Sequence, residues 1–379
     1  MRRLRLLLTW LALVPLAGTT APARAQTPEP SEAMRAVPAD SAADVAETPP
    51  RSGWYYVLPV VAYSPETKFA FGATAARYYR LSDEPDARPT TISPLAMVTT
   101  NSQIILGLFG DLWWSDDRWH LATNLSFSKY PTQFYGIGDD TPASAEEDYT
   151  PRTAELFVDV SRALSGAFYL GAIVNAKHTT LRDLADGGLL AAGGIAGAEG
   201  GALVGAGISA AWDTRDAVHY PTRGWYHRLA CVRYLDGLGS DFTYTAVDLT
   251  LTRYWSLGGA RVLALNLAGA SLAGDPVPFY ELSRLRLRGY FEERYLERHA
   301  VRAQLEFRTP VWRRLGAAVF VGAGELAARL DRLRLDEVYP AAGCGVRYNL
   351  GGEQRANLRL DVGFGDGDSG VYVRFAEAF

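Results

Sequence analysis

From residue 54 onward, hydrophobic and polar side chains alternate along the chain with a period of two. The clearest case is the stretch 300–310, where one face carries Val301, Ala303, Leu305 and Phe307 and the other carries Arg302, Gln304, Glu306 and Arg308. The stretches 118–130 and 355–365 alternate in the same way. This period predicts β-strands rather than helices. A face that carries arginine and glutamate cannot lie in hydrocarbon, so a membrane-spanning strand of this kind needs a polar lumen on that side.

Gly, Pro, Asn and Asp divide the alternating region into sixteen runs. Their predicted first residues are Trp54, Thr67, Pro89, Gln103, Arg118, Arg152, Gly166, Ala202, Gly224, Asp241, Ala260, Ala300, Leu315, Val338, Arg355 and Ser369. Long connections follow odd-numbered runs, most clearly at 131–150, 181–201 and 274–299. Outer-membrane barrels have short periplasmic turns and long external loops. The pattern therefore predicts an all-β fold, a 16-stranded antiparallel transmembrane β-barrel that starts and ends on the periplasmic side.

The residues before the first run have two different compositions. Residues 1–25 combine three early arginines, an apolar run and the small-residue site Ala23-Arg24-Ala25, which together predict a secretory signal peptide. The apolar run is too short for a membrane helix. Residues 26–51 are rich in Pro, Ala, Ser and acidic residues, and we expect a disordered periplasmic linker there. Residues 52–379 form the predicted barrel domain.

Composition narrows the function classes. The net charge of −4 argues against nucleic acid as a partner. Cys231 and Cys344 lie in separate strand-like runs, and no spaced cysteine framework accompanies them, so the sequence leaves their state open. The aromatic residues gather near the ends of the runs, where a membrane barrel has its interfacial girdles. A large soluble β-sandwich core is the alternative for the same aromatics.

No catalytic or metal-binding constellation is recognisable, so we expect a protein that is not an enzyme and has no cofactor. The five histidines have no metal-ligand spacing, and no Gly-x-Ser-x-Gly motif is present. His120 and Asn124 share a strand face, but alternation puts that face in the lumen. The glycine-rich stretch 193–197 lacks a strand-to-helix context and reads as an external loop. The acidic loop around Asp139 and Asp148 fits solvated side chains better than a calcium site.

Four segments carry a family resemblance. They are Tyr63–Thr67 with Phe71-Gly72, Phe134–Thr141, Asp213–Asp216 with Tyr220–Gly224, and Leu287–Tyr290 with Gln304–Arg308. In this order they resemble the BamA/TamA superfamily of outer-membrane proteins, the bacterial surface antigen barrel domain. The resemblance covers roughly Trp54–Phe379, in a short form without periplasmic repeat domains.

The resemblance implies an inward-folded sixth external loop with the motif Arg288, Gly289 and Tyr290, between the eleventh and twelfth runs. In the family, the arginine meets acidic residues on the inner wall, usually including an aspartate of the thirteenth strand. Here Gly322 stands at that place, so Glu306 and Asp361, both lumen-facing by alternation, become the candidate partners. The alternative is that Arg288 is one of several solvated loop arginines.

Two further motifs follow from the resemblance. The periplasmic turn motif between the eighth and ninth strands comprises Asp213, Arg215, Asp216, Pro221 and Gly224. In the last strand, predicted over 369–379, Phe375 and Phe379 share a face and resemble the C-terminal insertion signal of outer-membrane barrels. Glu377 interrupts that apolar face, and a plain closing strand is the alternative.

By resemblance, the function is non-catalytic assembly, insertion or translocation of protein or lipid at the outer membrane of a Gram-negative bacterium. The implied partners are outer-membrane lipid and lipopolysaccharide, a client outer-membrane or exported protein, and the barrel assembly machinery for the chain's own insertion. The alternative function is a passive pore or a structural outer-membrane barrel without client activity.

Overall fold

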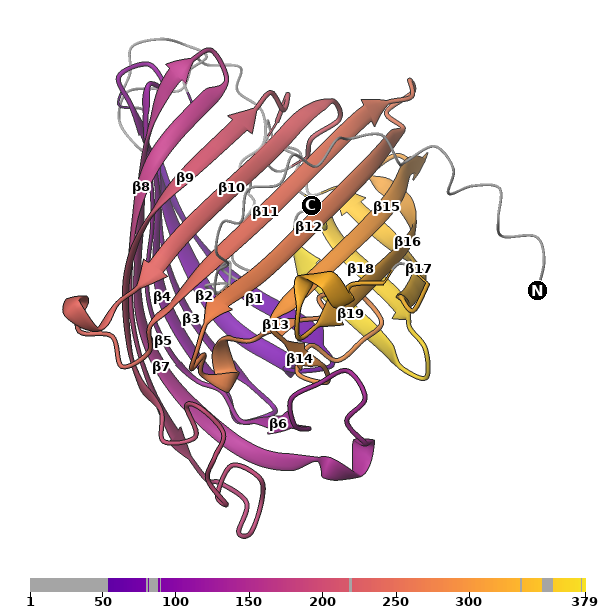
Figure 1. Ribbon diagram of the computed structural model, residues 1–379. Coiled ribbons are helices and arrows are strands. Elements are labelled where there is room, and N and C mark those ends of the chain that lie inside the picture. The colour runs from indigo at the N-terminus through magenta and orange to yellow at the C-terminus, as the bar shows by residue number, and fades with distance from the viewer. Residues whose placement is uncertain are drawn as a thin grey trace.

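The computed structural model describes residues 54–79, 81, 88, 90–217, 220–334, 336–349, 357–375 and 377–379. Sixteen antiparallel strands form a closed barrel (Figure 1). They are β1 (Trp54–Ser64), β2 (Lys68–Tyr79), β3 (Thr90–Thr99), β4 (Ile104–Trp114), β5 (Trp119–Lys129), β7 (Glu147–Ser165), β8 (Phe168–Arg182), β9 (Gly201–Asp213), β10 (Gly224–Tyr234), β11 (Tyr244–Ser256), β12 (Val262–Gly274), β15 (His299–Trp312), β16 (Leu315–Ala327), β17 (Tyr339–Asn349), β18 (Asn357–Phe364) and β19 (Ser369–Phe375). The predicted signal peptide and linker lie outside the described residues.

Short elements occupy the connections. They are β6 (Thr132–Phe134), β13 (Ser283–Arg284), β14 (Leu296–Glu297) and the 3-10 turns η2 (Ala143–Ala145), η3 (Asp236–Leu238), η4 (Phe279–Glu281) and η5 (Leu330–Arg332). None of the described helical segments has the length and apolarity of a membrane-spanning helix. Figure 1 shows β6, β13 and β14 grouped at one end of the barrel.

The predicted sixteen strands are confirmed, and most begin within three residues of the predicted position. The largest difference is β7, which begins at Glu147 rather than Arg152. There β6 pairs with Glu147–Tyr149 and extends the strand beyond the barrel wall. Most of the connection predicted over 131–150 is therefore folded back on the barrel as a hairpin rather than left as an open loop.

Alternation places opposite chemistry on the two faces of the wall. On β15, Leu305 is 38% exposed and its neighbour Glu306 is 0% exposed. On β18, Leu360 is 44% exposed and Asp361 is 0% exposed. Successive strand residues point to opposite faces, so the exposed leucines form the outer surface and the buried acids face the lumen.

Tryptophans mark the barrel end that has the short turns. Trp212, Trp225 and Trp312 are exposed there, and Trp114 stacks on Trp119 across the turn between β4 and β5. Amphipathic indole rings are favoured where a barrel leaves the hydrocarbon layer. This arrangement is the predicted aromatic girdle.

Candidate functional site

The long loop (residues 275–298), between β12 and β15, packs its apolar side chains against the wall. Leu285 is 1% exposed and Leu287 is 3% exposed. Both lie over glycines of β16: a Cβ atom at Gly324 would lie 2.7 Å from Leu285 Cδ1, and one at Gly322 would lie 3.2 Å from Leu287 Cδ2. Gly322, at the place where the resemblance implies an aspartate, thus makes room for a leucine of the loop.

Arg288 bridges two carboxylates from different strands. Its Nη2 atom lies 2.7 Å from Glu306 Oε2, and its Nη1 atom donates a hydrogen bond of 2.8 Å to Asp361 Oδ2. The guanidinium also lies 3.5 Å from the centroid of the Phe320 ring. Both carboxylates are 0% exposed, and a buried carboxylate needs a charged partner to offset its lost hydration. The structure therefore brings Arg288 together with Glu306 and Asp361, the two acids that alternation places on the lumenal face.

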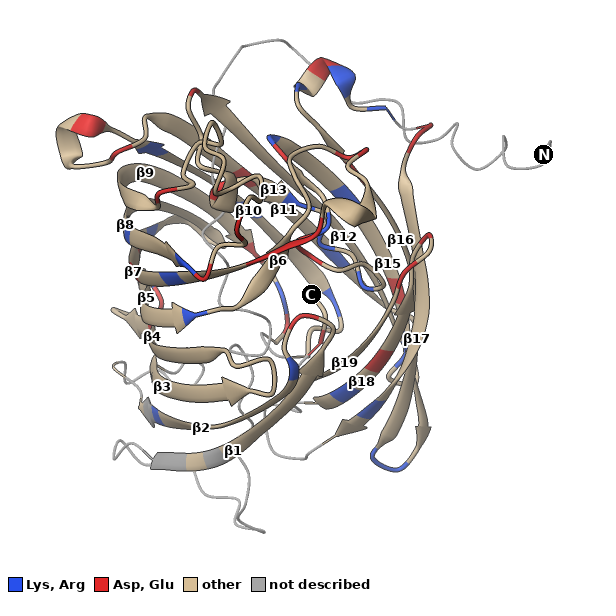
Figure 2. Cartoon of the chain, turned by 90° about the horizontal axis from the view of Figure 1, so that it is seen from below, with Lys and Arg blue, Asp and Glu red and all other residues tan. Residues whose placement is uncertain are grey.

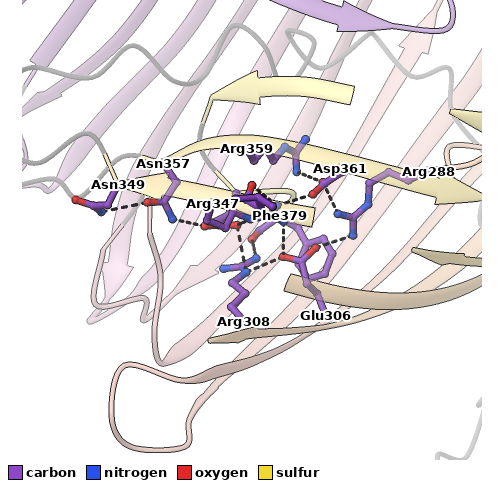
Figure 3. A network of polar contacts seen from close by, with 11 residues as sticks. Arg288, Glu306, Arg308, Arg347, Asn349, Asn357, Arg359, Asp361 and Phe379 are labelled. Carbon is purple, nitrogen blue, oxygen red and sulfur yellow. Dashed lines mark hydrogen bonds and ion pairs between the residues drawn. The ribbon is translucent and has the colours of Figure 1, made fainter. Parts of the chain in front are cut away.

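A larger network surrounds this bridge (Figure 3). Its charged members are Arg288, Arg308, Arg347, Arg359, Glu306, Asp361 and Glu377. Arg308 Nε donates to Glu306 Oε1 at 2.7 Å, and Arg347 Nε donates to Glu377 Oε2 at 2.9 Å. Sequence reasoning did not single out Arg308, Arg347, Arg359 or Glu377 as site residues, although alternation puts the first three on the lumenal face. The network links β15, β17, β18, the long loop and the end of the chain.

The two residues after Arg288 fix the course of the loop backbone. Gly289 has a φ of +116°, and its N–H donates to the Tyr372 hydroxyl at 2.9 Å. A Cβ atom at this position would lie 2.6 Å from the carbonyl carbon of Phe364, so the loop backbone lies directly against β18. The Tyr290 hydroxyl donates to the Pro340 carbonyl at 2.7 Å.

The connection between β5 and β7 covers the long loop. The Gly138 N–H donates to the Leu296 carbonyl at 3.0 Å, and Arg294 Nη1 donates to Thr141 Oγ1 at 2.9 Å. Seen along the barrel, β6 crosses the mouth (Figure 2). The segment 134–141, noted for its family resemblance, thus lies on the loop that carries Arg288.

The long loop also reaches the opposite wall. Lys177 of β8 donates to Glu281 Oε1 at 2.7 Å, and both side chains are buried. Beside this pair, the rings of Phe134 and Phe279 pack edge to face with centroids 5.0 Å apart. Ion pairs to β8, β15 and β18 therefore hold one loop against strands on both sides of the barrel.

Glu66, in the turn between β1 and β2, meets the tip of the long loop. The Glu292 N–H lies 3.4 Å from Glu66 Oε1 and donates a weak hydrogen bond to it. Burial, together with the negative charge of Glu292, raises the pKa of Glu66 from 4.5 to about 7. The first hairpin and the long loop are thus joined at a carboxyl group that titrates near neutral pH.

A pH dependence follows from the raised pKa of Glu66. The folded protein holds this proton more tightly than the unfolded chain, so the stabilising contribution is complete below pH 4.5 and is lost as pH rises through about 7. Replacing Glu66 with glutamine should flatten thermal stability over that interval and raise the melting temperature at pH 8. Thermal unfolding of the detergent-solubilised barrel from pH 4 to 9 measures this. A variant with the parent's slope would contradict the assignment.

The predicted turn motif between β9 and β10 is built on Asp213. Arg215 binds this carboxylate with two nitrogens, Nε at 2.9 Å and Nη2 at 3.0 Å. Arg88, from the connection between β2 and β3, adds a third contact at 3.2 Å. A bidentate arginine fixes orientation as well as charge, so this turn ties distant strands together at the barrel rim.

The rest of the turn motif closes the turn itself. Asp216 Oδ1 accepts hydrogen bonds from the N–H groups of Thr222 and Arg223, at 2.8 and 3.2 Å. Although partial burial acts in the opposite direction, the hydrogen bond from the Thr222 hydroxyl and these two N–H bonds lower the pKa of Asp216. Pro221 is buried, and Gly224 has a φ of +108° with the Thr214 carbonyl where a Cβ atom would stand.

The predicted extent of the last strand was wrong. β19 ends at Phe375, and residues 377–379 are outside it. The Phe379 carbonyl oxygen accepts a hydrogen bond of 3.0 Å from Arg308 Nη2, on the lumenal side, so Phe379 does not continue a lipid-facing strand. The physical reason is Glu377, whose carboxylate pairs with buried arginines and turns the end inward. The side chain of Phe375 lies outside the described residues, and the insertion-signal role stays a prediction.

Comparisons with known proteins bear on this architecture. The sequence model described as the Omp85 superfamily domain matches residues 96–379. No curated protein matches the sequence. Among solved structures, BamA from Haemophilus ducreyi lacking POTRA domains 1–3 is similar with a TM-score of 0.57 and 14% identity, over 86% of this chain and 70% of that one. CdiB from Acinetobacter baumannii has a TM-score of 0.53 and 10% identity, over 85% of this chain and 59% of that one. At these identities the two structures establish a shared barrel fold.

Proposed function

The chain belongs to the Omp85 superfamily and is an integral outer-membrane β-barrel, and from that premise we propose that it is a non-catalytic factor that assembles, inserts or translocates protein or lipid. The barrel would work by opening the seam between its first and last strands. The long loop, folded into the lumen and held by Arg288, would stabilise the closed state. The N-terminus would lie in the periplasm. The insertion of the chain into the outer membrane would use the barrel assembly machinery.

The observation that carries the proposal is the pairing at the seam. β1 pairs with β2 at eleven positions, from Trp54↔Tyr78 to Ser64↔Lys68. Among the described residues, β1 pairs with β19 only at Tyr63↔Val373. A strand edge with unsatisfied backbone groups is costly in lipid and is a template for another strand. A weakly paired seam in a chain of this family supports an opening that receives a client strand or perturbs the bilayer next to it.

A disulfide across the seam tests this proposal. Tyr63 and Val373 stand directly opposite each other, so cysteines at both positions meet the distance that a disulfide needs. In a strain that lacks the gene, the oxidised double variant should fail to restore the outer-membrane proteins or lipids lost on deletion, and reduction should restore them. The quantitative outer-membrane proteome and lipid profile are the readouts, and they also identify the client.

A second disulfide controls for cross-linking as such. Val321 and Ala342 are paired within the continuous ladder between β16 and β17, and both are exposed on the outer face. Cysteines there should leave activity intact in the oxidised state. If the seam-locked barrel restores the envelope as well as this control does, the seam does not open in function. An envelope unchanged by deletion would favour the alternative, a passive pore or structural barrel.

A further inference from the structure

A cavity of about 80 Å³ lies between the long loop and the barrel wall. Its polar lining consists of Arg228, Asp248, Thr250, Arg284, Arg286 and Arg302. The wall residues come from β10, β11 and β15, and alternation places them on the lumenal face. Since a water molecule occupies about 30 Å³ of liquid, the cavity has room for two or three waters or one small oxyanion.

Four of the residues that line this cavity are arginines. Arg228 donates to Asp159 at 2.8 Å, and Arg284 donates to Glu293 at 2.9 Å. Arg284 also donates to the carbonyl oxygens of Leu282 and Tyr280, at 3.2 and 3.1 Å. Asp248 is the one carboxylate among the cavity-lining residues. The lining is therefore rich in cationic donors.

Arg286 stands out within this lining. The structure gives its guanidinium no hydrogen bond or ion pair with any described residue, and its Nε atom is buried without an acceptor. Its carbonyl oxygen accepts from Arg302 at 2.7 Å, which holds the Arg286 backbone beside the wall. A buried guanidinium N–H without an acceptor is costly, and an anion in the cavity would remove that cost.

We propose that this cavity binds a phosphate group that carries a proton, either orthophosphate or a phosphomonoester headgroup. The arginines supply charge and planar donors that match phosphate oxygens. Asp248 supplies the selectivity, because an ionised carboxylate only accepts hydrogen bonds. It tolerates hydrogen phosphate, whose hydroxyl can donate to it, and repels sulfate, which has no proton at neutral pH. A bound phosphate would also tie Arg284 and Arg286 of the long loop to Arg228 and Arg302 of the wall.

Equilibrium dialysis of radiolabelled orthophosphate against the full chain in a phosphate-free maltoside detergent at pH 6.5 tests this proposal. Orthophosphate should bind, and sulfate should compete at least tenfold more weakly. Arg286→Gln should weaken orthophosphate binding at least tenfold, whereas Arg332→Gln, the same charge change at an exposed loop position, should leave it unchanged. Asp248→Asn should bring sulfate to within about threefold of phosphate.

Three outcomes would overturn the proposal: no orthophosphate binding by the parent chain, equal binding of sulfate by the parent chain, or parent-like binding by Arg286→Gln. The sulfate comparison uses only the parent chain, so it decides even if a variant fails to fold. Competition with short-chain phosphatidate separates the two sources. If phosphatidate displaces the labelled orthophosphate at a lower concentration than unlabelled orthophosphate does, the site is assigned to a lipid headgroup. If phosphatidate needs a higher concentration, the site is assigned to free phosphate.

Discussion

Replacing Arg288 with alanine should lower the free energy of unfolding of the barrel by about 3 kcal/mol, near the lower end of the cost of breaking a buried ion pair. The change leaves Glu306 and Asp361 without their shared cation and removes the contact with the Phe320 ring. The expected loss stays near the lower end because Arg308 and Arg347 remain on the same carboxylates. Urea unfolding followed by tryptophan fluorescence measures the change.

Arg288→Ala should also change how well the lumen conducts ions. A loop without the two ion pairs of Arg288 is held less firmly against β18, so ion conductance in planar bilayers should rise. If the barrel is an assembly factor, activity should also fall when corrected for the amount of protein in the outer membrane. Arg334→Ala is the matched control: its partner Glu337 is exposed, and exposed pairs contribute under about 1 kcal/mol. A variant of Arg288 that matches this control in stability and conductance would rule out the loop-holding role.

The second large effect is expected for Gly289→Ala, at about 3 kcal/mol. Two costs combine: a φ of +116° that L side chains rarely adopt, and a methyl group 2.6 Å from the carbonyl carbon of Phe364. The neighbouring atoms belong to backbone and cannot rotate away, so the loop itself must shift. The expected signature is a lower heat-modification temperature in gel electrophoresis, together with easier proteolysis of the segment 275–298.

Gly367→Ala separates the two costs. Gly367 also has a positive φ, +74°, but a Cβ atom there has no neighbour within 4 Å. This variant should lose about 1 kcal/mol, the backbone cost alone. If Gly289→Ala loses no more than Gly367→Ala, the loop is not in contact with β18 at this point, and the account of the loop backbone fails.

The strand count and the partners of Arg288 could be read from the sequence because side-chain direction in a strand is local. A residue such as Glu306 or Asp361 faces the lumen whatever its distant neighbours are. Long, regular alternation therefore specifies the faces of the wall, and Gly322 in place of an acid directs the search to the next lumenal carboxylates. The fold follows from the same periodicity, which repeats in sixteen runs.

The rest of the site depends on distances around the barrel that no local pattern contains. Alternation places Arg308 and Arg347 on the lumenal face, as it does many other residues. Only the relative stagger of β15 and β17 brings both of these arginines next to Glu377. The inward turn of Phe379 had one sequence signal, the acidic Glu377 in an otherwise apolar face. An ionised carboxylate beside lipid is expensive, and that cost was a reason to end the last strand at Phe375 instead of Phe379.

The ion pairs of Glu377 bear on which edge of the seam would move in the proposed opening. β19 leads directly into a carboxylate held by Arg308 of β15 and Arg347 of β17. An outward swing of β19 alone would break these buried ion pairs, so in the proposed opening β15–β19 would stay together. The opposite edge is the hairpin of β1 and β2, whose turn meets the long loop through Glu66. In the proposed opening, the edge that moves would therefore be the first hairpin, and deprotonation of Glu66 at its turn would weaken its contact with the long loop.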